Sequence, residues 1–306
     1  MGTSPAKPMS KIIVIGSSNT DMVIVSDRLP KPGETILGGQ FLLNPGGKGA
    51  NQAVAAAKLG GETHFVCKVG NDVFGEMTRN QFIETGIHSE FIQTDLANPS
   101  GVALINVDAQ GENCITVASG ANGTLSKADI DNASILFDKE NILLIQLEIP
   151  LDSVWYAVEK AAHAGMKVIL NPAPAAQIPD HIYPYLFAIT PNETEIELLT
   201  GIAVTRLDDA KKAADLLIKK GVAHVIITLG AQGAYYQSAH DELFVPTQAV
   251  KAVDTTAAGD CFNGALAVAL SQQKSWLDAI NFSCRAATYS VMHAGAQASM
   301  PKLSDL

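Results

Sequence analysis

The sequence predicts an α/β fold in which a mostly parallel central sheet is flanked by helices and a small β-sheet forms a lid. Short apolar strands alternate with helical segments after about residue 126, a pattern typical of a parallel sheet covered on both faces. Two separated segments, near 17–45 and 93–120, show short β-like runs, so we expect them to meet in the lid. One domain then spans 10–306, and residues 1–9 are expected to be a disordered leader or a cloning scar.

The first half of the chain mixes short strands with two helices. Apolar runs rich in Val and Ile predict strands, and an Ala-rich segment closed by Gly60 and Gly61 predicts a helix. We expect strands at 12–15, 22–25 and 64–68, and helices at 50–59 and 73–85. Further β-like segments around Phe91, at 102–107 and at 114–117 are assigned to the small sheet.

The second half shows the alternation that predicts the parallel sheet. Buried-type apolar runs are followed by helical patterns that end near glycine or polar residues. We expect strands at 142–147, 167–170, 187–189 and 225–228, and helices at about 151–164, 192–200, 207–220, 259–271 and 275–293.

Composition excludes several classes of function. The chain of 306 residues has 21 Lys and Arg against 31 Asp and Glu, so its net charge of −10 argues against a nucleic-acid partner. No apolar run is long enough to span a membrane, and no secretory signal precedes the first strand. The four cysteines form no C-x-x-C pair, which favours reduced thiols and a cytoplasmic protein.

Polar residues follow several predicted strands, where open parallel sheets bind their ligands. Asn19 and Asp21 come after the first strand and could hold neighbouring hydroxyls of a polyol, although both residues are also common in turns. Glu148 ends an apolar run and could bind a hydroxyl, or it could be an acid at the start of the next helix.

A glycine cluster opens the Ala-rich helix. Gly46, Gly47 and Gly49 surround Lys48 and would let the backbone approach a ligand closely. It is not a P-loop, because Leu42 and Gly49 stand where that motif needs Gly and Ser or Thr. The alternative is a glycine-rich turn that carries a surface lysine.

Two further motifs each precede a helix. Asn192 and Glu195, within 190–195, fit a capping box, but could also face a ligand. In the segment 253–260, the small residues Ala257, Ala258 and Gly259 clear space around the first N–H groups of a helix, which suits a phosphate or an oxyanion. Asp260 could then take a proton from an attacking hydroxyl, or it could cap the helix.

The remaining motif is weak, and some expected motifs are missing. The loop 228–233 could lie along a nucleotide, although a G-x-x-G pattern carries little information alone. There is no G-x-G-x-x-G after the first strand, no H-E-x-x-H and no G-x-S-x-G. These absences disfavour dinucleotide enzymes, zinc hydrolases and serine hydrolases.

Two of these motifs together give a resemblance to the PfkB carbohydrate kinase family, and within it to the ribokinase group. The cluster Gly46-Gly47-Lys48-Gly49-Ala50-Asn51 precedes Asp254-Thr255-Thr256-Ala257-Ala258-Gly259-Asp260, and this order is highly specific. Segments 171–175 and 190–195 also match, and the likeness runs from about Lys11 to Pro301.

The resemblance implies a ribokinase-like fold and ATP-dependent phosphorylation of the 5-hydroxyl of D-ribose, with Mg²⁺, K⁺ as a monovalent activator, and a homodimer formed through the lid. It implies a sugar site of Asn19, Asp21, Gly47, Lys48, Gly49, Ala50, Asn51, Glu148 and Asp260. The implied nucleotide site comprises Asn192, Glu195, Thr228, Leu229, Gly230, Ala231, Gln232, Gly233, Gly259 and Cys284. The implied K⁺ site comprises Asp254, Thr256, Ser290, His293, Gly295 and Ser299, several of them through backbone carbonyls.

Two positions depart from the commoner family pattern. Cys284 stands where His or Asn often approaches the nucleotide, and His293 replaces a frequent Arg or Lys. Three alternatives remain at this point: a kinase acting on deoxyribose, a kinase acting on a nucleoside, and a non-catalytic sugar-binding protein. Asn19 favours ribose, because its amide has a partner in a 2-hydroxyl that deoxyribose lacks.

Overall fold

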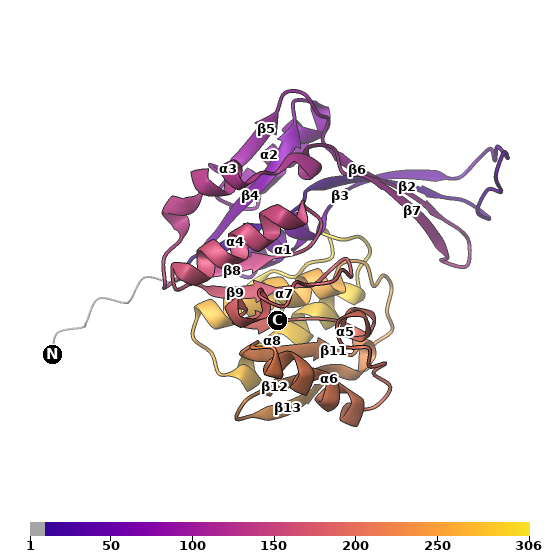
Figure 1. Ribbon diagram of the computed structural model, residues 1–306. Helices are drawn as coiled ribbons and strands as arrows, with labels where there is room; N and C mark the ends of the chain where they lie inside the picture. Colours follow the sequence, from indigo (N-terminus) through magenta and orange to yellow (C-terminus); the bar gives the residue numbers. More distant parts are fainter. Residues whose placement is uncertain (1–9) are drawn as a thin grey trace.

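A nine-stranded sheet runs through the centre of the molecule (Figure 1). The computed structural model describes residues 10–306, so the predicted leader at 1–9 lies outside the described residues. Strand order is β13-β12-β11-β10-β9-β8-β1-β4-β5. Neighbours from β11 to β5 pair in parallel, whereas β12 and β13 pair antiparallel at one edge. The predicted mostly parallel sheet is therefore confirmed.

Apolar strands form the middle of this sheet. The run Ile12–Ile15 is wholly buried, as expected for a strand covered on both faces. Side chains alternate between the two faces, so Ile12 and Val14 pack into one hydrophobic core while Ile13 and Ile15 pack into the other. The sheet strands are β1 (Ile12–Ile15), β4 (Thr63–Gly70), β5 (Ile92–Asp95), β8 (Ile142–Ile145), β9 (Lys167–Leu170), β10 (Ala188–Ile189), β11 (His224–Thr228), β12 (Gly233–Ser238) and β13 (Glu242–Pro246).

Helices cover both faces of the sheet. The first core contains side chains of α1 (Lys48–Lys58), α2 (Val73–Glu84), α7 (Ala258–Ser271) and α8 (Trp276–Val291). The second core contains side chains of α3 (Lys127–Asn132), α4 (Leu151–His163), α5 (Glu193–Thr200) and α6 (Leu207–Lys219). Short 3-10 helices are η1 (Gly120–Thr124), η2 (Ser134–Leu136), η3 (Tyr183–Tyr185), η4 (Gly230–Gln232) and η5 (Leu303–Asp305). None of the described helices is long and apolar enough to cross a membrane.

A separate four-stranded sheet forms the lid and projects from the body (Figure 1). Its strands are β2 (Asn19–Val25), β3 (Gln40–Gly46), β6 (Gly101–Val107) and β7 (Asn113–Ala118), in the order β3-β2-β6-β7. The small sheet predicted from two distant segments therefore exists.

Three details of the prediction were wrong. The segment near Phe91 does not belong to the lid, because β5 pairs with β4 in the central sheet, with Cys67 opposite Ile92. The second lid segment accordingly begins at Gly101 rather than near residue 93. The antiparallel pair β12 and β13 and the short helix α3 were not predicted. Strand pairing depends on distant partners, which local composition does not reveal.

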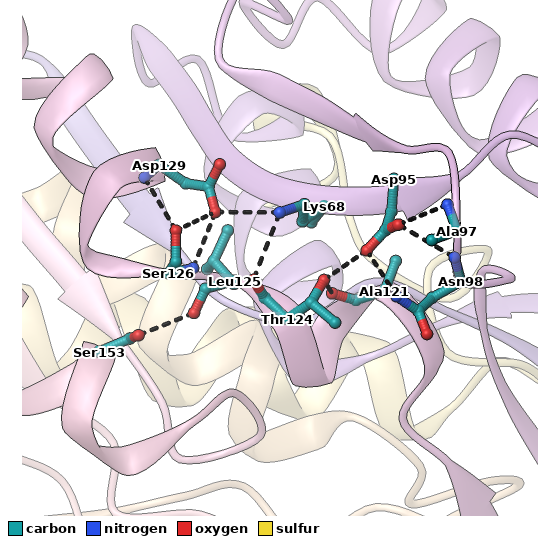
Figure 2. A network of polar contacts seen from close by, with 10 residues as sticks. All are labelled: Lys68, Asp95, Ala97, Asn98, Ala121, Thr124, Leu125, Ser126, Asp129 and Ser153. Atoms are coloured by element: carbon teal, nitrogen blue, oxygen red, sulfur yellow. Dashed lines mark hydrogen bonds and ion pairs between the residues drawn. The ribbon is translucent and has the colours of Figure 1, made fainter.

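Polar contacts join β4, β5, η1, α3 and α4 (Figure 2). Lys68 Nζ lies 3.3 Å from the Thr124 carbonyl and 3.2 Å from Asp129 Oδ2. Asp95 Oδ2 accepts a hydrogen bond of 2.6 Å from Thr124 Oγ1, and Ser153 Oγ donates to the Leu125 carbonyl at 2.7 Å. These contacts hold the segment that follows β7 against the central sheet, and so fix the root of the lid.

Candidate active site

A cavity of about 180 Å³ lies beyond the carboxyl ends of the central strands, at the start of α7. This is the edge where an open parallel sheet is expected to bind ligands. Its walls bring together residues from the glycine cluster, the 190–195 segment and the 253–260 segment. They include Lys48, Asn192, Glu195, Thr228, Ala257, Ala258, Gly259 and Asp260, together with Asn171, Ala173, Thr190, Thr255 and Asn263.

Asp260 is buried in the first turn of α7 and is held by two amides. Asn51 Nδ2 donates to its Oδ2 and Gln52 Nε2 donates to its Oδ1, both at 2.9 Å. The helix begins at Ala258 and the residue before it, Ala257, has no side chain that caps it, so the alternative that Asp260 caps the helix is wrong. Burial raises the pKa of Asp260, while the charge of Lys48 and the two amides oppose that rise. The carboxyl group is thus available as a base inside a cavity.

Backbone N–H groups line the start of α7. Ala257 has φ of 60°, a left-handed conformation that is uncommon outside glycine, and it turns the chain sharply into the helix. The Ala258 N–H donates to the Thr255 carbonyl, but within residues 10–306 the N–H of Gly259 meets no backbone acceptor. A Cβ added at Gly259 would meet no atom within 4 Å, so open space lies in front of it. This arrangement suits an anion.

Three further polar residues at the site were not predicted: Asn263 lines the cavity, whereas Gln52 and Gln146 form hydrogen bonds behind its wall. Gln52 Nε2 also lies 3.0 Å from Asn171 Oδ1, and Gln146 Nε2 donates to Gln52 Oε1 at 2.6 Å. Asn263 Nδ2 donates to the Gly259 carbonyl at 2.8 Å and so braces the helix start. Gln52 directly follows the recognised Asn51, and Asn263 lies one turn beyond Asp260. Helical spacing could therefore have indicated Asn263, whereas Gln52 and Gln146 reach the site only through distant contacts.

The glycine cluster packs against the loop after β1. Gly47 has φ of 87°, and a Cβ there would come within 2.7 Å of the Asn19 nitrogen, so the close approach requires glycine. The N–H groups of Gly49 and Ala50 donate to Ser17, at its Oγ (3.4 Å) and its carbonyl (2.8 Å). The cluster is therefore a tight junction between α1 and the loop after β1.

Lys48 and Glu148 meet at this junction. Glu148 Oε2 accepts hydrogen bonds from Ser17 Oγ at 2.5 Å and from the Lys48 backbone N–H at 3.0 Å. Glu148 does lie just ahead of Pro150, which precedes the first residue of α4, Leu151, as the alternative of a helix-entry acid expected, but its hydrogen bonds go to Ser17 and Lys48. Burial alone would lower the pKa of Lys48, but Asp260, Glu148 and Glu195 outweigh it and raise the pKa. Lys48 is thus a partly buried cation rather than a surface lysine.

Asn19 and Asp21 lie in strand β2 and not in a turn. They are two residues apart, so both face the same side of the lid. Asn19 Oδ1 accepts a hydrogen bond of 2.7 Å from Asn122 Nδ2. Burial, together with the charge of Glu148, raises the pKa of Asp21 to about 6.

A larger cavity of about 550 Å³ opens between the lid and the body. Asn19 and Glu148 line it, along with Asn122 and, from lid strand β7, Val117. Polar groups from β2, η1 and the loop after β8 therefore converge under the lid, an arrangement that suits a small polyhydroxylated molecule.

A third cavity, of about 390 Å³, adjoins the start of α7 on the other side. Seven of the predicted nucleotide residues line it: Asn192, Thr228, Gly230, Ala231, Gly233, Gly259 and Cys284. Leu229 packs into the hydrophobic core instead, and Gln232 is exposed outside the lining. The loop 247–252 and residues of α8 form much of the wall and were not predicted.

The segment at the start of α5 has the predicted capping box. Asn192 Oδ1 accepts from the Glu195 N–H at 2.8 Å, and Glu195 Oε2 accepts from the Asn192 N–H at 2.9 Å. Both residues also line the 180 Å³ cavity, so capping and ligand binding are compatible. Burial raises the pKa of Glu195, against the effects of the Asn192 N–H and Lys48.

The residues of the predicted K⁺ site lie around two neighbouring loops. Asp254 accepts hydrogen bonds of 2.9 Å from the Thr256 and Gly295 N–H groups. Burial would raise its pKa, but these hydrogen bonds prevail and lower it. The side chains of the other three residues bond to carbonyls of their own turns: Ser290 to Ala287, His293 to Tyr289, and Ser299 to Ala296.

The chain is similar to known carbohydrate kinases. A family model described as "pfkB family carbohydrate kinase" matches residues 9–303. A ribokinase of Haemophilus influenzae is 43% identical over 95% of this chain and 95% of its own length. A deoxyribokinase of Salmonella typhi is 39% identical over 95% of this chain and 96% of its own.

The fold is also similar to solved structures. The structure of an Arabidopsis thaliana ribokinase complexed with ribose and ATP superposes with a TM-score of 0.88 at 32% sequence identity. The superposition covers 97% of both chains.

Proposed function

The chain belongs to the pfkB family of carbohydrate kinases, and on that premise we propose that it transfers the γ-phosphoryl group of ATP to the 5-hydroxyl of D-ribose. The products are D-ribose 5-phosphate and ADP. One observation carries the proposal. The buried Asp260 carboxylate lies in a cavity beside the open N–H groups of α7, and further cavities adjoin it on the lid side and on the α8 side.

Asp260 is the proposed general base. It takes the proton from the sugar hydroxyl as that oxygen forms a bond to the γ-phosphorus, and the bond from phosphorus to the bridging oxygen of ADP breaks. At the start of α7, the small residues Ala257 and Ala258 leave room for the transferred group, and the Gly259 N–H, which meets no backbone acceptor within residues 10–306, stabilises its charge. Lys48 adds a positive charge at the same cavity.

The sugar binds under the lid in this proposal. Asp21 and Glu148 supply acceptors for hydroxyls, and Asn51 and the backbone of Gly47 to Ala50 border the reacting end. Asn19 uses its Oδ1 to accept from Asn122, so its own amide N–H groups remain to donate to a 2-hydroxyl. This arrangement supports ribose over deoxyribose.

ATP occupies the 390 Å³ cavity in this proposal. The loop 228–233 borders its sugar and phosphates, and Cys284 with the loop 247–252 borders its base. Most of the lining is apolar on this side, from residues such as Val250, Phe262 and Val291, which suits a purine ring.

Two cations complete the proposed chemistry. Mg²⁺ would neutralise the phosphates near Glu195 and Asn192, whose oxygens are the ligand type that Mg²⁺ prefers. K⁺ would bind near Asp254, Thr256, Ser290, His293, Gly295 and Ser299. Because Ser290, His293 and Ser299 already use their side chains locally, these residues would offer carbonyl oxygens.

The lid supports a homodimer. Residues opposite one another on neighbouring strands share a face. Ile24 is paired with Phe41, and Met22 with Leu43 and Leu104, which makes an exposed apolar face on the side away from Asp21. An exposed apolar face of this kind marks an association surface, here with a second copy. The four free thiols support a reducing, cytoplasmic location.

A coupled assay for ADP release tests the activity. Purified protein with ATP, Mg²⁺ and K⁺ should release ADP rapidly with D-ribose and slowly without sugar, since a closed lid excludes water. Comparable release with and without ribose would contradict the proposal.

The similarity to a deoxyribokinase makes 2-deoxyribose the main alternative substrate. Comparing kcat/KM for ribose, 2-deoxyribose and adenosine decides among sugar, deoxysugar and nucleoside. We expect the order ribose, then 2-deoxyribose, then adenosine. Asn19→Leu should reduce the difference in kcat/KM between ribose and 2-deoxyribose, because it removes the amide proposed to bind the 2-hydroxyl.

A further inference from the structure

Two His–Glu pairs meet near the amino end of β4, at the end of the central sheet opposite the candidate active site. Glu62 immediately precedes β4, and His64 is the second residue of that strand. His88 follows α2 and forms a parallel bridge with His64, and Glu90 lies two residues further on. In extended backbone, residues two apart point to the same side, so the pattern E-x-H on one segment faces H-x-E on the other.

His64 is the unusual member of this group. It is only 6% exposed, and neither of its ring nitrogens has a hydrogen-bond partner within residues 10–306. Buried polar groups are nearly always partnered, because an unpartnered one costs about 1–3 kcal/mol. Its Nε2 lies 3.8 Å from Glu62 Oε1, beyond hydrogen-bond distance. Something other than the described protein atoms would satisfy this ring.

We propose that Glu62, His64 and His88 form a binding site for a divalent transition-metal ion of the zinc class. One ligand atom from each residue lies within 4.8 Å of the others. Two imidazoles and a carboxylate are a common zinc ligand set, and ligand atoms around tetrahedral zinc are separated by about 3.4 Å. A small movement of the exposed side chains would bring the three ligand atoms from within 4.8 Å of one another to the separation that zinc requires.

The exposed members can make this movement. The side chains of Glu62 and His88 are 37% and 44% exposed, whereas His64 is fixed by its burial. The two rings are stacked, with centroids 4.3 Å apart and planes at 13°, so their lone pairs do not converge as they stand. Metal binding therefore requires His88 to rotate out of the stack while His64 stays in place.

The charged surroundings favour a cation. Glu90 Oε1 lies 3.5 Å from His88 Nδ1 and provides a possible fourth ligand. Lys11 Nζ is 3.8 Å from Glu62 Oε1 and would be displaced by the ion.

Titration of the untagged full-length chain with ZnCl₂, followed by calorimetry, tests the site. We expect one ion per chain at this site, and visible absorption of a tetrahedral complex when CoCl₂ replaces zinc. His88→Ala and Glu62→Gln change exposed side chains, so the fold should persist, and each should weaken binding at least about tenfold. Circular dichroism verifies that both variants are folded.

Two matched controls separate this site from general metal binding. His181 lies 3.6 Å from Glu159 as a single His–Glu pair, so His181→Ala should leave binding unchanged. Cys114 is an exposed thiol, and Cys114→Ser should leave it unchanged as well. The proposal is overturned if the wild-type chain takes up no zinc or cobalt, or if His88→Ala and Glu62→Gln bind as tightly as the wild type.

Discussion

At the level of single residues, the candidate site depends on how amides and charges control Asp260. Asn51 and Gln52 each donate to one of its oxygens, and Lys48 faces it across the cavity. These contacts stabilise the ionised form, which burial disfavours. The carboxylate is therefore held in one orientation and kept able to accept a proton.

Asp260→Asn should lower kcat at least about a hundredfold, because the amide cannot accept the proton from the sugar hydroxyl. Circular dichroism should show an intact fold. Asp152 occupies the first turn of α4 as Asp260 does that of α7, so Asp152→Asn serves as the control with normal turnover. Near-normal turnover of the Asp260 variant would remove this residue from the role of base.

Gln52→Leu should raise the pKa of Asp260, because one of its two amide donors is lost. A hydrogen bond to a charged group contributes about 1.5–3 kcal/mol, so the acidic limb of the profile of kcat/KM against pH should move up by about 1–2 pH. Gln81 belongs to the same chain of amides but joins it through Gln297, so Gln81→Leu should move the limb less. Equal profiles for the Gln52 variant and the wild type would argue against this positioning role.

Asp21 should make stability depend on pH. Its pKa of about 6 in the fold exceeds the ordinary 3.8, so folding favours the protonated carboxyl. The contribution of Asp21 to the free energy of unfolding is therefore full below pH 4 and is lost as the pH rises through about 6. Asp21→Asn stays neutral and should therefore raise the free energy of unfolding by about 2–3 kcal/mol at pH 8, with no gain at pH 4. Urea unfolding at both pH values measures this, with the exposed Asp27→Asn as control.

At the level of elements, the starts of α1 and α7 build the site from opposite directions. Both helices lack a side-chain cap, which leaves their first N–H groups to other partners. At α1 the partner of Lys48 N–H is Glu148, while at α7 the Gly259 N–H meets no backbone acceptor within residues 10–306. Helix α5 has the opposite arrangement, because Asn192 and Glu195 cap each other. One helix start is therefore open for an anion while another is closed.

The root of the lid gives a prediction about stability. Lys68→Met removes the donor to the Thr124 carbonyl and to Asp129, and should lower the free energy of unfolding by about 1–3 kcal/mol. Lys219→Met changes an exposed lysine at the end of α6 and should have little effect. Chemical denaturation of the two variants measures the difference. Equal stability of the two variants would show that the contacts of Lys68 make no net contribution to the free energy of unfolding.

At the level of the whole molecule, the two faces of the lid differ in exposure and polarity. Asp21 lies on the face toward the body, opposite Asn44 and Ala103, whereas Ile24 and Leu104 are exposed on the other face. A four-stranded sheet that projects from the body cannot bury both faces against it (Figure 1). Association through the outer face would remove that apolar surface from water.

If the proposed dimer forms through this face, Leu104→Lys should convert it to a monomer, which size-exclusion chromatography with light scattering measures. A charge in the middle of an apolar interface lacks a partner and is costly to bury. Ile135 is equally apolar and highly exposed, but it lies in η2 away from the lid, so Ile135→Lys should remain dimeric. A wild-type monomer, or a dimeric Leu104 variant, would contradict the proposed interface.

Much of the fold and part of the site followed from local patterns. Helices expected at 151–164 and 207–220 are found as α4 and α6 to within one residue, because a helix shows its buried stripe within a single stretch of chain. The two motifs that carry the glycines and Asp260 were found for the same reason: close backbone approach and an open helix start demand small residues at fixed spacing.

The rest depended on contacts between distant parts of the chain. Gln52 lies 208 residues from Asp260, and Asn171 lies 119 residues from Gln52, so no local pattern links them. Strand β5 was assigned to the wrong sheet for the same reason, since its identity comes from pairing with β4. The order of residues determined which groups could act as base, cation and acceptor. Packing of the sheet determined which of them meet, because hydrogen bonding and desolvation act between neighbours in space, whatever their separation along the chain.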